Sequence, residues 1–336
     1  MAFCYGAPRM PELRRDPVVD RWVIIAPERA DRPNALIRDF QLPDDEDGCP
    51  FCPGNEFLTP PEIAALREQG RWTWRIVPNR YPALRTEERM SRKGIGLYDR
   101  VAGVGAHEVI IETDSHKQPL HELPLPRISS VLRAVQDRIL DLSRDVRLRS
   151  IVFFKNSGAI AGGSLSHAHS QLLALPIVPL ELQRELEGAR RHFEARERCI
   201  YCDVLDQEIG DRSRLVLETD LCVVLAPYAA RTPFELLVLP REHRSAFERS
   251  SAEELSALAS ALRTALRKLD LALDRPAYNL YLHTLPLREP PSDSFHFHLE
   301  IKPVLTLQGG FEWSTGYSVN PTPPEEAAAF LRQTEA

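Results

Sequence analysis

Residues 162–176 read GGSLSHAHSQLLALP, the pattern of a β-strand entered through a glycine-rich loop. Side chains alternate between the two faces of a strand, so His167, His169 and Gln171 are predicted to share one face. The small residues before them allow backbone N–H groups to approach a phosphate closely. A second His-x-His pair, His296 and His298, stands near the other end of the chain.

The two halves of the chain present the same features in the same order, which predicts an internal duplication. Each half has a Cys-x-x-Cys pair, an apolar strand leading to a lone histidine, an amphipathic helix, a further strand and a His-x-His pair. The spacing from lone histidine to His-x-His is 51 residues (116 to 167) in one half and 53 (243 to 296) in the other. The predicted strands cover 107–113 and 149–156, then 234–240 and 278–284.

The predicted helices carry apolar residues at helical spacing: Ile128, Val131, Leu132, Val135, Ile139 and Leu142 in the first half, and Leu255, Leu258, Leu262, Leu266 and Leu269 in the second. Ser251, with Glu254 three residues later, predicts a capping box. A charged helix over 181–198 is expected to join the halves. We therefore expect an α+β fold, a mostly antiparallel sheet with flanking helices, divided into residues 1–185 and 186–336.

The bulk composition excludes several classes of protein. The 336 residues carry a net charge of −6, which gives no general attraction to nucleic acid or acidic membranes. No run of about 18 apolar residues occurs, and the N-terminus lacks a signal-peptide pattern. We expect a cytoplasmic protein that binds neither nucleic acid nor membrane.

Two sets of metal ligands follow from the duplication. Zinc favours four Cys or His ligands in a tetrahedron, and each half offers such a set: Cys49, Cys52, His116 and His167 in the first, and Cys199, Cys202, His243 and His296 in the second. With four protein ligands each, both zinc sites are predicted to be structural. The alternative for each Cys-x-x-Cys pair is a disulfide or two unrelated core thiols. Cys4 and Cys222 have no nearby cysteine partner and are expected to be inert thiols.

The second set has a competitor. His298 and His283 could join His296 around a metal, with Glu185 completing that group. The sequence leaves both ligand sets open.

His169 is the predicted nucleophile. A neutral imidazole attacks phosphorus and forms a covalent intermediate, which divides one difficult displacement into two easier ones. Gln171 is placed to donate its NH₂ to a phosphoryl oxygen in the transition state. The alternative, a structural histidine on a half-buried strand, does not account for the His-x-His-x-Gln pattern.

These motifs resemble the galactose-1-phosphate uridylyltransferase family of the histidine-triad superfamily. The resemblance extends over the whole chain and rests on CPFC (49–52), SHAHSQ (166–171), DPVVDRWVIIAPERADRP (16–33), VPNRYPAL (77–84), FFKNSGA (153–159) and GGFEWSTGY (309–317). It implies His169 as the nucleotidylated residue, Gln171 as its supporting amide and a homodimer. It also implies a set of contacts to a nucleotide sugar and a sugar 1-phosphate: Arg29, Arg32, Asn79, Asn156, Ser164 and Glu312.

Three departures bear on the substrate. A Lys and a Gln that bind the hexose phosphate in the family are Thr306 and Ser318 here, and an Asp that binds the ribose is Arg80. The leading hypothesis is exchange of UMP between UDP-glucose and galactose 1-phosphate. The second zinc motif points instead to the related ADP-glucose phosphorylases, which would use the same histidine. A non-catalytic zinc-ribbon binding protein is the remote alternative.

Overall fold

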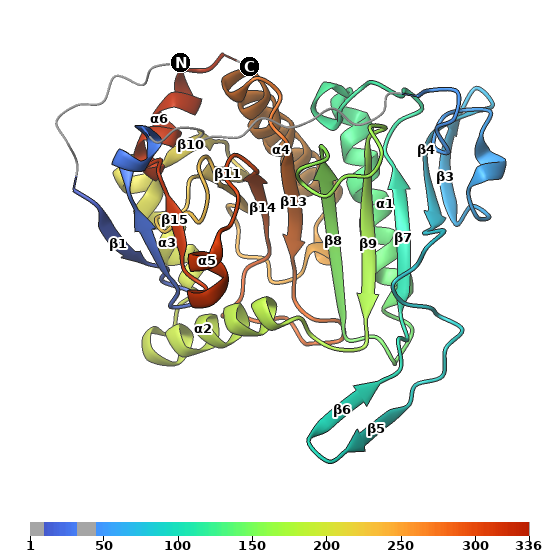
Figure 1. Ribbon diagram of the computed structural model, residues 1–336, viewed down its shortest axis with the longest axis horizontal. Helices are drawn as coiled ribbons and strands as arrows, with labels where there is room; N and C mark the ends of the chain where they lie inside the picture. Colours follow the sequence, from blue (N-terminus) through green and yellow to red (C-terminus); the bar gives the residue numbers. More distant parts are fainter. Residues whose placement is uncertain (1–9, 32–44, 336) are drawn as a thin grey trace.

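A single ten-stranded sheet organises the computed structural model, which describes residues 10–31 and 45–335 (Figure 1). The strand order is β10-β11-β12-β14-β13-β8-β9-β7-β4-β3. The N-terminal half supplies β3 (Ala64–Glu68), β4 (Arg71–Pro78), β7 (Ala106–Ile111), β8 (Ser150–Ser157) and β9 (His169–Leu175). The C-terminal half supplies β10 (Leu215–Glu218), β11 (Cys222–Leu225), β12 (Leu236–Pro240), β13 (Tyr278–His283) and β14 (His298–Pro303).

The strand order displays the predicted duplication. Reading outward from the central β8–β13 pair, one half runs β8, β9, β7, β4, β3 and the other β13, β14, β12, β11, β10, so equivalent strands occupy equivalent places. All pairings within this sheet are antiparallel. The predicted α+β class with a mostly antiparallel, duplicated sheet is thereby confirmed.

Two long helices cover one face of the sheet, behind it in Figure 1. They are α1 (Leu125–Leu142) and α4 (Ala252–Leu273), and their predicted apolar residues are all buried in one core with the strands. Helix α4 begins with the predicted capping box: the Ser251 hydroxyl accepts from the Glu254 N–H at 3.1 Å, and the Glu254 carboxylate accepts from the Ser251 N–H.

The other face of the sheet carries the predicted functional residues. On β9, Leu172 and Ala174 join the core with α1, so His169 and Gln171 point to the opposite side. In the C-terminal half this opposite face is covered by α2 (Leu180–Arg196), the predicted joining helix, and by α3 (Ile200–Asp211). Each half thus has a core face covered by a long helix, and in the C-terminal half α2 and α3 cover the second face as well.

The remaining elements lie around this frame. A three-stranded sheet contains β1 (Glu12–Arg15), β2 (Trp22–Ile25) and β15 (Ser318–Asn320), with α5 (Gly310–Thr315) beside it and α6 (Pro324–Gln333) near the C-terminus (Figure 1). A hairpin of β5 (Arg92–Ile95) and β6 (Tyr98–Val101) projects from the N-terminal half. Short 3₁₀ helices occupy Pro27–Asp31, Glu56–Leu58, Leu120–Glu122 and Phe247–Arg249. Across the described ranges, no helix has the length and apolar character needed to span a bilayer.

Candidate active site and metal centres

The four predicted ligands of the first half lie together. The ligand atoms of Cys49, Cys52, His116 and His167 are all within 4.8 Å of one another, and all four residues are buried. The Cys52 Sγ is 3.2 Å from the His116 Nδ1 and 3.5 Å from the His167 Nδ1, while the Cys49 Sγ is 3.7 Å from the His167 Nδ1. Metal bonds of about 2.3 Å to sulfur and 2.0 Å to nitrogen, at a tetrahedral angle, separate S and N by about 3.5 Å. The group therefore fits a tetrahedral zinc ion.

Hydrogen bonds orient both histidines of this group toward the sulfurs. The His167 Nε2 donates to the backbone oxygen of Thr113 at 2.8 Å, and the His116 Nε2 lies 3.1 Å from the Ser166 Oγ. Because a carbonyl oxygen only accepts, the Nδ1 of His167 keeps its lone pair for a metal. Burial lowers the pKa of His167 to about 4, which keeps the ring neutral as metal binding requires.

His169 is held in one tautomer by its own strand. The ring is buried, and its Nδ1 donates to the backbone oxygen of His167 at 2.8 Å. The hydrogen of the neutral ring is therefore on Nδ1, and Nε2 carries a lone pair. Burial, and then the nearby Lys155 ammonium, hold the pKa of His169 below its usual range. These are the properties of an imidazole that can attack phosphorus.

A buried ion pair supports the backbone of His169, and no sequence motif marked either partner as functional. The Lys155 Nζ donates to the Glu112 Oε2 at 2.8 Å and to the backbone oxygen of His169 at 2.9 Å. The Lys155 and Glu112 side chains are 4% and 1% exposed, respectively. The pair joins β8, β9 and the end of β7 at the predicted nucleophile.

Gln171 is bonded to a histidine that the sequence analysis did not single out. Its Oε1 is 2.8 Å from the Nε2 of His107, on β7, and accepts from the Asn79 Nδ2 at 3.4 Å. His107 lies inside the predicted strand 107–113, where only the apolar pattern was informative. The contact depends on the pairing of β7 with β9, which places His107 opposite Leu173 and diagonal to Gln171.

The other predicted substrate contacts fall in two places. Asn156 lies beside the glycine-rich loop: its Oδ1 accepts from the Asn279 Nδ2 at 2.9 Å, and its Nδ2 is 3.5 Å from the Gly162 oxygen. Gly162 has a φ of 88°, a conformation that a residue with a Cβ rarely adopts. Ser164 follows on this loop and is exposed.

Arg29 and Glu312 line a cavity of about 550 Å³ together with Lys302, Thr306 and Ser318; neither His169 nor Gln171 is among its lining residues. The Glu312 carboxylate also accepts from the Gly309 N–H at 2.8 Å at the start of α5. Arg32 lies outside the described residues.

The second cysteine pair gathers the ligands predicted for it. The ligand atoms of Cys199, Cys202, His243 and His296 lie within 4.8 Å of one another. The Cys202 Sγ is 3.5 Å from the His243 Nδ1 and 3.7 Å from the His296 Nδ1. The distances again fit a tetrahedral ion. All five cysteines within the described ranges are free thiols, so neither Cys-x-x-Cys pair is a disulfide here.

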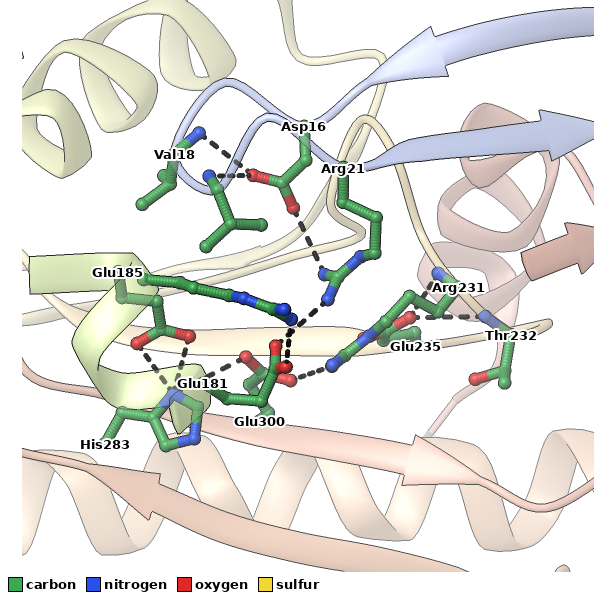
Figure 2. Close-up of polar contacts among 12 residues, drawn as sticks. Asp16, Val18, Arg21, Glu181, Glu185, Arg231, Thr232, Glu235, His283 and Glu300 are labelled. Carbon is green, nitrogen blue, oxygen red and sulfur yellow. Dashed lines mark hydrogen bonds and ion pairs between the residues drawn. The ribbon is translucent and has the colours of Figure 1, made fainter. Parts of the chain in front are cut away.

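The competing ligands form a third group without His296. Glu185, His283, His298 and Glu300 place their ligand atoms within 4.8 Å of one another. The His283 Nδ1 is 2.8 Å from the Glu185 carboxylate (Figure 2). Burial alone would lower the pKa of His283, but the Glu185 and Glu300 carboxylates together outweigh it and raise that pKa to about 9.

An arginine supplies positive charge to this third group. Figure 2 shows the Arg231 guanidinium between Glu235 and Glu300, and its Nη2 pairs with a carboxylate oxygen of each. Tyr281 donates its hydroxyl to the same Glu300 oxygen. A cavity of about 800 Å³ lies alongside, lined by His298, Glu300 and Arg231 among others. Sequence reasoning missed Arg231 because nothing in its local pattern marks it.

Two family models match the chain, one after the other. The N-terminal domain of galactose-1-phosphate uridyl transferase matches residues 7–179, and the C-terminal domain of the same family matches residues 185–330.

Relatives of two activities resemble the whole chain. ADP-glucose phosphorylase of Arabidopsis thaliana is 35% identical over 96% of this chain and 93% of its own length. Galactose-1-phosphate uridylyltransferase of Thermotoga maritima is 31% identical over 97% of this chain and 99% of its own. The crystal structure of the Arabidopsis phosphorylase with bound ADP-glucose superimposes with a TM-score of 0.84 at 34% identity, covering 97% of this chain and 99% of that one. A uridylyltransferase structure superimposes with a TM-score of 0.76 at 29% identity, covering 97% and 98%.

Proposed function

Since the chain belongs to the galactose-1-phosphate uridyl transferase family, we propose that it transfers a nucleoside monophosphate from a nucleotide sugar to a phosphorylated acceptor through a covalent intermediate on His169. One observation carries the proposal: the Nδ1 of His169 donates to the backbone oxygen of His167, which leaves the Nε2 lone pair free to attack.

In the first step, the Nε2 lone pair attacks the phosphorus that bears the nucleoside. The P–N bond forms as the P–O bond to the hexose phosphate breaks, and the departing hexose 1-phosphate keeps the electron pair. The ring then carries a positive charge, which the Nδ1–H bond to the His167 oxygen stabilises. In the second step a phosphate oxygen of the acceptor attacks the same phosphorus, the P–N bond breaks, and neutral His169 is restored.

Two sets of N–H donors prepare the site for this chemistry. Gln171, on the same face of β9, donates its NH₂ to a phosphoryl oxygen as charge shifts in the transition state. The loop before His169 brings backbone N–H groups near the phosphates, aided by Gly162.

The two four-ligand groups stabilise the fold in this proposal and take no direct part in the transfer. Cys49, Cys52, His116 and His167 hold one zinc ion; Cys199, Cys202, His243 and His296 hold a second. Bound zinc supplies folding free energy in closed four-ligand sites of this kind. Because His167 is both a ligand and the hydrogen-bond partner of His169, the first site secures the position of the nucleophile.

For the substrate, the first candidate is exchange of UMP between UDP-glucose and galactose 1-phosphate. The second is ADP-glucose phosphorolysis, in which inorganic phosphate accepts AMP. Two observations favour the second: the 35% identity to the Arabidopsis phosphorylase, and Thr306 and Ser318 in the places of two hexose-phosphate contacts of the uridylyltransferases. A homodimer and a cytoplasmic location complete the proposal, on the resemblance and the sequence pattern alone.

Intact-mass spectrometry after incubation with UDP-glucose or ADP-glucose tests the proposal. We expect a UMP or AMP adduct with one of the two, absent in His169→Asn, and the adduct that forms identifies the nucleotide. Transfer from the adduct to galactose 1-phosphate or to inorganic phosphate identifies the acceptor. If neither nucleotide sugar yields an adduct on the zinc-loaded protein, the proposal is wrong and a non-catalytic zinc-binding role is favoured.

A further inference from the structure

We propose that His107 is a positioning residue that determines which end of the Gln171 amide faces the reacting phosphoryl group. The inference rests on the proposed function, because it concerns how Gln171 assists transfer to His169. It goes beyond it by adding a residue that touches neither the nucleophile nor the metal groups and acts through Gln171.

A backbone amide determines the tautomer of His107. The Ala83 N–H donates to the His107 Nδ1 at 3.2 Å. A backbone N–H only donates, so Nδ1 is the acceptor and the hydrogen of the neutral ring is on Nε2. The opposite tautomer would direct two N–H groups at each other.

The tautomer of His107 in turn determines the orientation of Gln171. The His107 Nε2–H points at the Gln171 side chain 2.8 Å away, and only the amide oxygen can accept from it. Rotating the amide by half a turn would bring its NH₂ against the Nε2–H. The Ala83 N–H thus determines the tautomer of His107, and that tautomer determines which end of the Gln171 amide is the oxygen and which is the nitrogen.

A second backbone amide gives the same answer through Asn79. The Tyr81 N–H donates to the Asn79 Oδ1 at 2.8 Å, which turns the Asn79 NH₂ toward Gln171, 3.4 Å from its oxygen. The Asn79 Nδ2 is also 3.2 Å from the His107 Nε2, as expected for two donors that converge on one oxygen. Tyr81 and Ala83 belong to one segment, so two backbone N–H groups of a single loop determine the orientation of the Gln171 amide, one through Asn79 and one through His107.

The consequence is that the NH₂ of Gln171 is the end left for the substrate. Within the described residues, 10–31 and 45–335, the Gln171 Nε2 has no hydrogen-bond partner, and both contacts of the amide are made by its oxygen. Gln171 and His169 are two residues apart on one strand face, so their Cα atoms are about 6.7 Å apart, within reach of a common phosphoryl group. An amide presented the other way would direct its oxygen at phosphoryl oxygens. Orientation in advance spares this adjustment during the reaction.

Single-turnover formation of the adduct measures the effect of His107. With saturating nucleotide sugar, we expect His107→Leu to lower the rate constant by about 10- to 100-fold, part of the 10²- to 10³-fold typical for losing one such donor. The concentration for half-saturation should change by less than about threefold, because only the transition-state contact is weakened. His107→Gln, which keeps an N–H donor near the position of Nε2, should retain most of the rate.

A double-mutant cycle separates positioning from general damage. In a Gln171→Ala background, His107→Leu should have no further effect on the rate, because the group through which it acts is gone. His107→Asn can keep an acceptor for the Ala83 N–H, but its NH₂ is too short to reach the position of Nε2 beside Gln171. It should therefore lower the rate as His107→Leu does, without removing the acceptor for Ala83. Leu173→Ala, at the residue paired with His107, is the control and should leave the rate unchanged.

The outcomes distinguish this inference from the function beneath it. A wild-type protein that forms no adduct overturns the proposed function. A wild-type adduct together with unchanged rates in His107→Leu and His107→Asn overturns the role of His107 alone. Equal losses in the presence and absence of Gln171 also overturn it, since the effect would then not pass through Gln171.

Discussion

His298 repeats the ring position of His169 on the equivalent strand of the other half. The His298 Nδ1 lies 3.1 Å from the backbone oxygen of His296, and the His169 Nδ1 lies 2.8 Å from that of His167. The surroundings of the two rings differ, however. The Nε2 of His298 is 3.9 Å from the Glu185 carboxylate and 3.8 Å from the Glu300 carboxylate. Glu300 follows His298 by two residues, and the residue at the same place after His169 is the uncharged Gln171. The two carboxylates beside its Nε2 disfavour the approach of a phosphate to His298, and Arg231 and the protonated His283 offset part of their charge.

We therefore expect one nucleotidyl group per chain. His169→Asn should reduce adduct formation to below a few per cent of wild type, whereas His298→Asn, the matched variant in the other half, should still form the adduct. Intact mass and peptide mapping provide the measurement. A second adduct, or an adduct that persists in His169→Asn, would show that His298 also reacts.

Gln171→Ala should slow adduct formation by about 10²- to 10³-fold, because it removes one donor to the phosphoryl oxygens. The covalent intermediate should still form, since the His169 tautomer does not depend on Gln171. Rapid-quench kinetics with a labelled nucleotide sugar measure the rate constant. A loss of less than about threefold would contradict a transition-state role for this amide.

Metal analysis should find two zinc ions per chain. Cys52→Ser should remove one of them and lower the melting temperature, because bound metal contributes folding free energy. It should also slow adduct formation, because His167, whose backbone oxygen accepts from the His169 Nδ1, would no longer be held by the metal. The control is Cys222→Ser, a buried thiol outside both groups, which should retain two zinc ions. Unchanged rate and melting temperature in zinc-depleted Cys52→Ser would contradict the coupling between metal and nucleophile.

Lys155→Met should destabilise the fold by about 3–5 kcal/mol, because it leaves the Glu112 carboxylate buried without its partner. The double variant Lys155→Met with Glu112→Leu should recover much of this free energy of unfolding, since no unpaired charge remains. Urea unfolding monitored by circular dichroism measures both. If the double variant is less stable than Lys155→Met alone, the pair is not the source of the cost.

Acceptor selectivity should depend more on the phosphate than on the sugar. Thr306 and Ser318 line the cavity that contains Glu312, and the cations that line it with them are Arg29, Arg231 and Lys302. Lys302→Met should raise KM for galactose 1-phosphate, glucose 1-phosphate and inorganic phosphate alike, because charge-assisted contacts to phosphate are strong. On the preformed adduct, kcat/KM for the two sugar phosphates should differ by less than about 100-fold, or about 2.7 kcal/mol. A larger preference for galactose 1-phosphate would show that other residues recognise the sugar.

Local patterns were sufficient for the repeat and for much of the site. The spacing of apolar residues predicts α1 and α4 because a helix buries one face at a period of 3.6 residues, and the Ser251–Glu254 cap follows from adjacent residues. The ligand groups of Cys49 and Cys199 were predictable because metal chemistry restricts them to a few residue types, repeated in step. The division at residue 185 remains a proposal.

Contacts between segments that are distant in the sequence were determined by the tertiary structure alone. The pairing of β7 with β9 brings His107 to Gln171, and the meeting of β8 with β13 joins the two halves into one sheet. The sequence left open whether Glu185 and His283 join His296; in the folded chain they group with His298 and Glu300 instead, and Arg231 pairs with that Glu300. A sequence shows periodicity and residue chemistry because both are local, whereas these contacts arise from strand register and long-range packing, which only the folded chain determines.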